Sequence, residues 1–160
     1  MKNIIKFNLL ALILLIFNLK NVQSQSLPVK IGEIQGNYLI ITKNLTDIKI
    51  QWETFMALGQ DTVDLDTTTF EILYDVIDTT YLLLGSNTAR TIKCTVLLNP
   101  HLNGDLYEMA NNDGGATSVT CKGCSSGCSP RRKKNGDGYC TWCLGNCEKT
   151  ETLSQNLVFF

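Results

Sequence analysis

The sequence predicts an α+β fold, in which a small antiparallel sheet is covered by one amphipathic helix and is followed by a C-terminal cysteine-rich, mostly irregular module. Three observations predict it. One segment has helical periodicity, short β-rich segments separated by turns follow it, and six of the seven cysteines lie between positions 121 and 147. A strand, a helix and then several strands is an order typical of a helix packed on an antiparallel sheet.

The N-terminal segment has the pattern of a secretory signal peptide over residues 1–24. Two lysines accompany an apolar run at residues 7–19, which is too short to span a bilayer. Val22 and Ser24 supply the small side chains of a cleavage site, so we expect cleavage before Gln25. We therefore expect a secreted or periplasmic protein with no stable membrane insertion after the signal is removed.

The helix is expected over residues 47–58, after an extended segment at residues 31–41. Gly59 occupies the position of a C-terminal cap. The apolar residues at helical spacing are Ile48, Trp52, Phe55 and Met56. This spacing favours packing in the core over a ligand site.

The segment 60–69 is acidic and carries Asp61, Asp64 and Asp66. A calcium loop also needs a central glycine and a closing glutamate, which this segment lacks. We expect a solvated loop and no bound metal there.

Four strands are expected after this loop, and short turns make them antiparallel neighbours. They are expected at residues 70–74, 81–84, 91–98 and 105–109, with turns at residues 78–79 and 85–87. The consecutive apolar residues at 81–84 indicate burial on both faces of the sheet.

The turn-rich linker at residues 111–117 is the expected domain boundary. It divides the mature chain into an α+β domain (25–116), a cysteine-rich module (117–150) and a C-terminal tail (151–160). Residues 25–120 hold five basic and twelve acidic side chains, whereas residues 121–149 hold six and two. An acidic domain therefore carries a basic module.

The cysteine-rich module contains two copies of C-x2-C-x3-C at an offset of nineteen residues: Cys121, Cys124 and Cys128, then Cys140, Cys143 and Cys147. In an oxidising compartment such cysteines close into disulfides. Six cysteines allow fifteen pairings, and the duplication favours bonds between matching positions of the two copies. The module has few aliphatic residues, so disulfides must replace a hydrophobic core.

Two alternatives remain for these cysteines. Cys121, Cys124, Cys140 and Cys143 have the spacing of a structural four-thiolate zinc site. The pair Cys140 and Cys143 also forms a C-x-x-C motif, which would make the protein an exported thiol-disulfide oxidoreductase. No strand–helix–strand pattern precedes that motif, and the glycine-rich surroundings favour permanent disulfides.

Four consecutive cations lie between the two cysteine triplets: Arg131, Arg132, Lys133 and Lys134. Such a run is either a solvated tip or a contact for a polyanion. A secreted chain with few interleaved aromatic residues is not expected to bind nucleic acid.

The two remaining candidates are Cys94, expected to be a buried free thiol, and His101, expected in a surface turn. Neither has a catalytic partner nearby in the sequence, so we expect no catalytic residues and no cofactor. The sequence predicts a secreted non-enzymatic binding or structural protein, whose extracellular partner is a protein or an anionic polysaccharide.

Overall fold

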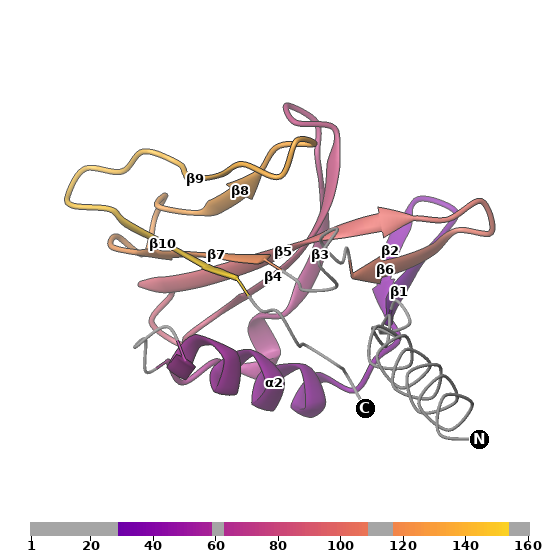
Figure 1. Ribbon diagram of the computed structural model, residues 1–160, viewed down its shortest axis with the longest axis horizontal. Coiled ribbons are helices and arrows are strands. Elements are labelled where there is room, and N and C mark those ends of the chain that lie inside the picture. Colours follow the sequence, from indigo (N-terminus) through magenta and orange to yellow (C-terminus); the bar gives the residue numbers. More distant parts are fainter. Residues whose placement is uncertain (1–28, 59–62, 109–116, 154–160) are drawn as a thin grey trace, which may run out of the picture.

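The computed structural model describes residues 29–58, 63–108 and 117–153 (Figure 1). The expected signal peptide, Gln25, Gly59, Asp61, residues 111–116 of the expected linker and residues 154–160 of the expected tail lie outside these residues. The elements follow in chain order: β1 (Lys30–Gln35), β2 (Tyr38–Ile41), α2 (Leu45–Leu58), the 3₁₀ helix η1 (Thr67–Thr69), β3 (Glu71–Asp75), β4 (Thr80–Ser86), β5 (Ile92–Pro100), β6 (Asp105–Glu108), β7 (Thr117–Lys122), β8 (Pro130–Arg132), β9 (Gly138–Cys140) and β10 (Glu148–Leu153).

The predicted helix-covered α+β fold is wrong. The described part of the chain is mostly β: 47% of its residues are in strands, and eight strands form one curled antiparallel sheet. One path through the sheet has the order β10-β7-β5-β6-β1-β2, and β4 and β3 extend from the other edge of β5. The cysteine-rich region is present and most of residues 117–150 lie outside strands, as expected, but β7 and β10 belong to the large sheet and β8 and β9 form a hairpin.

The expected extended segment at residues 31–41 folds back on itself as the hairpin β1–β2. Gln35 pairs with Tyr38, so the turn has two residues, and Gly36 in it has a φ of 61°. Glycine adopts this left-handed conformation at no steric cost. The Gly36–Asn37 dipeptide is a known signal for such a turn.

The four strands expected between residues 70 and 109 are present, and each pairs antiparallel with the next. The expected turn at residues 85–87 lies later in the chain, because Gly85 and Ser86 continue β4 and pair with β5. The side-chain carbonyl of Asn87 accepts hydrogen bonds from the backbone N–H groups of Thr91 and Ile92 and so closes the actual turn.

Helix α2 is present as predicted, with Asn44 as its N-cap. The Asn44 side chain accepts a hydrogen bond from the backbone N–H of Thr46 at 2.8 Å. Ile48, Trp52 and Met56 are buried in the main core, and Trp52 packs edge-on against Phe70 with ring centroids 5.5 Å apart. Their apolar spacing therefore serves packing.

The central strands have two buried faces, as the apolar run at residues 81–84 indicates. Leu82 and Leu83 are adjacent, point to opposite faces and are both 0% exposed. Cys94 and Val96 of β5 belong to the core formed with α2, whereas Lys93 of the same strand turns to the opposite face. Figure 1 shows α2 on one side of β5 and β7, and β8 and β9 on the other.

Glu108 ends β6 in a buried position opposite Leu98. Neither of its carboxylate oxygens has a hydrogen-bond partner among the residues that the structure describes. Burial raises its pKa to about 8, although the positive charge of Lys43 opposes this shift. Glu108 is therefore neutral in the folded protein up to mildly alkaline pH.

We expect the raised pKa of Glu108 to make the protein less stable as pH rises. Between the ordinary pKa of glutamate and about 8, the folded state binds a proton that the unfolded state has lost, so stability is greatest below that range and falls across it. The slope is at most about 1.4 kcal/mol per pH unit. Urea unfolding across this range should show a smaller pH dependence for Glu108→Gln. The exposed control Glu71→Gln should follow the parent, and equal slopes in all three proteins would contradict the prediction.

Candidate functional site

Three disulfides hold the cysteine-rich module, and each joins matching positions of the two copies. They are Cys121–Cys140, Cys124–Cys143 and Cys128–Cys147, all at a sequence separation of 19. This confirms the disulfide-stapled module and the pairing that the duplication favours. Three disulfides indicate an oxidising environment.

The four cysteines of the zinc alternative all take part in these disulfides. Zinc binds thiolates, so Cys121, Cys124, Cys140 and Cys143 could offer it ligands only after reduction. The sulfurs of Cys128, Cys143 and Cys147 lie within 4.8 Å of one another, but these residues are also disulfide-bonded.

The C-x-x-C motif does not form a disulfide within itself. Cys140 is bonded to Cys121 and Cys143 to Cys124. A thiol-disulfide oxidoreductase of the thioredoxin type needs its two motif cysteines to bond to each other, with the first at the start of a helix. Cys140 instead ends the strand β9.

The module covers the second face of the sheet. Val119 and Cys121 of β7 are fully buried against Cys128 and Cys143. A side chain at Gly138 would place its Cβ 2.3 Å from the Val119 side chain, so only glycine allows β9 to lie this close to β7.

Lys93 is the main polar anchor between the sheet and the module. This buried side chain donates from Nζ to the backbone carbonyls of Ser125 at 2.9 Å and Gly127 at 2.5 Å. Burial lowers its pKa, and the positive charges of Arg90 and Arg131 act in the same direction. The sequence offered no sign of this role, because its acceptors are backbone carbonyls about thirty residues away.

The β8–β9 hairpin is anchored to the β3–β4 hairpin through polar contacts. Arg131 Nε lies 2.9 Å from the buried carboxylate of Asp75. The hydroxyl of Tyr139 donates to Asp78 at 2.5 Å, and this hydrogen bond is the main reason that the pKa of Tyr139 rises to about 12. These contacts join segments that are more than fifty residues apart in the chain.

The four consecutive cations therefore have different roles. Arg131 is paired with Asp75, and Arg132 is buried, with a hydrogen bond to the carbonyl of Gly136. Lys133 and Lys134 are exposed, and neither forms an ion pair with a described residue. Of the four cations, the two lysines are therefore the most accessible to an external anion.

The remaining candidates from the sequence occupy structural positions. Cys94 is a buried free thiol that faces the carbonyl of Gly85, and burial raises its pKa. The His101 ring packs on Tyr107 with centroids 4.4 Å apart. In the acidic loop, Asp64 pairs with Lys49 at 2.6 Å and Asp66 caps η1.

Two surfaces stand out that the sequence did not reveal. The first is the loop at residues 141–146, which we call the knuckle, where Trp142 is 78% and Leu144 is 90% exposed. The second is a groove beside Tyr74 and Tyr81, which the pairing of β3 with β4 brings together. No sequence pattern marks either surface, because exposure and cross-strand pairing are properties of the fold.

Comparison with protein-family models, curated proteins and solved structures finds no match to this chain. Among the described residues, no helix has the length and apolar character needed to cross a membrane.

We expect alkylation of the denatured, unreduced protein to label one thiol, that of Cys94, and alkylation after reduction to label all seven cysteines. Mass spectrometry of the two samples measures this directly. Labelling of four or more thiols without reduction, with stoichiometric release of zinc, would contradict the disulfide assignment.

We expect Lys93→Met to lower the free energy of unfolding by about 1.5–3 kcal/mol, because it removes charged hydrogen bonds to two carbonyls and leaves them buried. Lys149→Met is the control, since Lys149 is exposed and should contribute less than about 0.5 kcal/mol. Denaturant unfolding measures both. Equal stability of the two variants would show that Lys93 is not an anchor.

Proposed function

We propose that this chain is a secreted, non-catalytic binding protein that holds a protein partner on the knuckle. The observation that carries the proposal is the exposure of Trp142 and Leu144 on a loop fixed by disulfides. The apolar run at residues 7–19 and the oxidised cysteines both support export.

The state of the reactive residues supports a non-catalytic role. The C-x-x-C cysteines are bonded to other partners, and the Cys94 thiol is buried with a raised pKa, so it is a poor nucleophile. The His101 ring is packed on Tyr107. A nucleophile and a base in contact, as hydrolases and transferases of the triad type require, is not found among the described residues.

The knuckle is rigid. Cys143 bonds to Cys124 in the first copy, and the carbonyl of Ser129 accepts a hydrogen bond from the N–H of Thr141 at 2.9 Å. The Ser129 N–H donates in return to the Thr141 hydroxyl. A preorganised loop loses little conformational entropy on binding, which favours affinity.

The two copies of the repeat differ at the exposed apolar positions of the knuckle. At the matching positions of the first copy, Trp142 is replaced by Gly123 and Leu144 by Ser125. Since tryptophan is the residue type most enriched at binding hot spots, the second copy has the composition of a binding surface.

A hollow beside Trp142 completes this surface, and Asn146 and Glu148 line it together with Cys140 and Thr141. An apolar anchor beside polar groups is the usual composition of a protein-binding hot spot, with a desolvated centre and a polar rim. The partner that fits is a protein with a complementary apolar pocket.

The test places a photoreactive p-benzoylphenylalanine at Leu144 or, as a matched control, at Ser125. After irradiation in the medium of cells that produce the protein, we expect a discrete adduct from position 144 and none from position 125. Trp142→Ser should abolish the adduct, because loss of a tryptophan hot spot costs at least about 2 kcal/mol.

A non-reducing thiol assay on each variant controls for intact disulfides. Adducts from both positions, or an adduct at 144 that does not depend on Trp142, would contradict the proposal.

A further inference from the structure

A groove lies where the sheet meets the cysteine-rich module, at the ends of β4 and β5 and against the β8–β9 turn. Its lining combines aromatic, polar and cationic side chains, among them Tyr74, Tyr81, Thr79, Asn99 and Lys134. Lys134 comes from the module, Thr79 from the turn between β3 and β4, and the others from the sheet. The groove therefore depends on the contacts that hold the module on the β3–β4 hairpin, among them those of Arg131 and Tyr139 and the hydrogen bond from the Thr80 hydroxyl to the Arg132 carbonyl.

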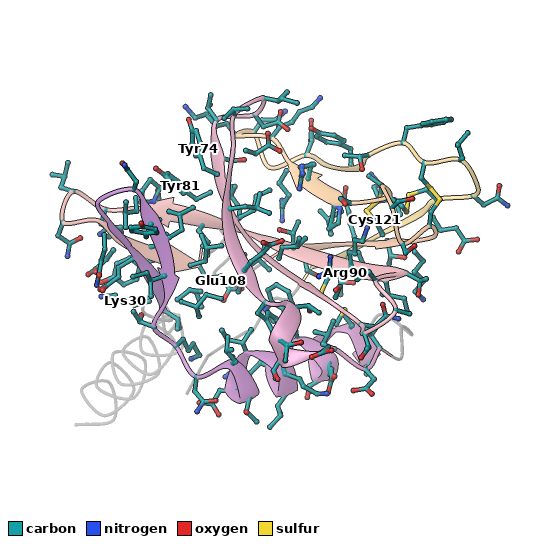
Figure 2. All side chains as sticks on the ribbon, turned by 180° about the vertical axis from the view of Figure 1, so that it is seen from behind. Lys30, Tyr74, Tyr81, Arg90, Glu108 and Cys121 are labelled. Atoms are coloured by element: carbon teal, nitrogen blue, oxygen red, sulfur yellow. A yellow bond between two sulfur atoms is a disulfide. The ribbon has the colours of Figure 1, made fainter. Side chains whose placement is uncertain are left out.

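Two tyrosine rings form one wall of the groove. Tyr74 and Tyr81 are direct cross-strand partners, and their ring centroids are 4.9 Å apart (Figure 2). Tyr81 packs against the main core, whereas Tyr74 is 45% exposed. The pair thus has a fixed inner ring and an accessible outer ring. The electron-rich face of an aromatic ring attracts the positively polarised C–H groups on the face of a sugar ring.

The cations at the groove are available to a ligand. Lys134 lines it and Lys133 is the adjacent residue in the same turn. Both are exposed, Lys133 lies 6.0 Å from the Tyr139 ring centroid, and neither forms an ion pair with a described residue. Because Asp75 already pairs with Arg131, it does not neutralise these two lysines.

We infer that this groove binds an acidic polysaccharide, with a pyranose ring against Tyr74 and Tyr81 and its carboxylate or sulfate groups on Lys133 and Lys134. The inference goes beyond the proposed function, because the groove and the knuckle share no residue. Hydroxyl and amide groups of Thr79 and Asn99 supply hydrogen bonds of the kind that sugar hydroxyls require.

The surroundings of the groove favour a narrow chain over a flat anionic surface. Asp137 is exposed in the same turn as the two lysines, and Asp78 lies next to the exposed Ile77 at the tip of the β3–β4 hairpin. An anionic bilayer pressed flat on this edge would meet both carboxylates, whereas neither Asp78 nor Asp137 is among the residues that line the groove. The exposed Val76 and Ile77 make a bilayer the alternative that the experiment must test.

The experiment measures binding of the whole secreted protein to four probes by isothermal titration: a heparin hexasaccharide, a hyaluronan hexasaccharide, a neutral maltohexaose and inorganic polyphosphate. We expect binding of the two acidic sugars and no measurable binding of maltohexaose. Lys133→Ser/Lys134→Ser should weaken binding of the acidic sugars by about tenfold or more. Tyr74→Ala should weaken binding of the acidic sugars by at least about fivefold and leave binding of polyphosphate unchanged, because polyphosphate has no ring to stack on the tyrosine.

A second double variant, Arg90→Asn/Lys149→Ser, is the matched control. It removes the same charge from exposed positions outside the groove, and asparagine tolerates the positive φ of 55° at Arg90. It should bind like the parent. Equal losses in both double variants, or a Tyr74→Ala variant that binds acidic sugars like the parent, would overturn the inference in favour of unspecific charge attraction.

Phosphatidylserine vesicles test whether this edge of the protein binds an anionic bilayer instead of a polysaccharide. Sedimentation with these vesicles without binding of acidic sugars would overturn the inference, as would the absence of binding to every probe. Trp142→Ser should bind the sugars like the parent, so that a failure of the groove is distinguishable from a failure of the knuckle. The Tyr74→Phe variant should also bind like the parent, which separates loss of the ring from loss of the hydroxyl.

Discussion

The covalent closure of the cysteine-rich module is the constraint on which the rest of the structure depends. The central strands have apolar residues on both faces, and α2 covers only one of them. The other face is covered by a segment with almost no aliphatic residues, which could not fold by apolar burial alone. Each disulfide closes a loop of about the size for which chain entropy predicts roughly 3 kcal/mol of stabilisation. The disulfides thus provide a rigid cover for Val119.

Electrostatic interactions then determine where the cysteine-rich module lies on the sheet and which of its cations stay exposed. Lys93 of the sheet donates a hydrogen bond to the backbone carbonyl of Ser125 in the first copy of the repeat, and Arg131 of the module pairs with the buried Asp75 of β3. A buried charge without a partner is strongly unfavourable, so these interactions specify one docked position. The four cations also differ in role: Arg131 and Arg132 form contacts within the fold, whereas Lys133 and Lys134 lie at the surface. One basic run thereby both attaches the module and provides the charge of the groove.

The sequence predicted features with a local signal and missed those that depend on long-range pairing. The spacing of Ile48 and Trp52 gave α2, and the cysteine repeat favoured the disulfides that form. The sheet was underestimated because β7 and β10 are rich in polar residues and lack clear alternation, so they gave no strand signal. In β7 the buried apolar residues are Val119 and Cys121, which pack against the disulfide-bonded Cys128 and Cys143. The candidate groove was equally invisible, since it needs Tyr74 and Lys134, which are sixty residues apart, to meet.

The two copies of the cysteine repeat have diverged in a way that matches their positions. The first copy faces the sheet, where Gly123 N–H donates to the carbonyl of Thr91 and Lys93 binds the carbonyls of the next residues. Space is limited there, because a Cβ at Gly123 would lie 2.5 Å from the carbonyl oxygen of Asn146. The second copy is stapled to the outside of the first and has no such neighbour at Trp142 and Leu144. The repeat therefore provides one copy that attaches to the sheet and a second copy that can carry large apolar side chains. The three disulfides between the copies fix the exposed loop of the second copy to the first copy and, through it, to the sheet.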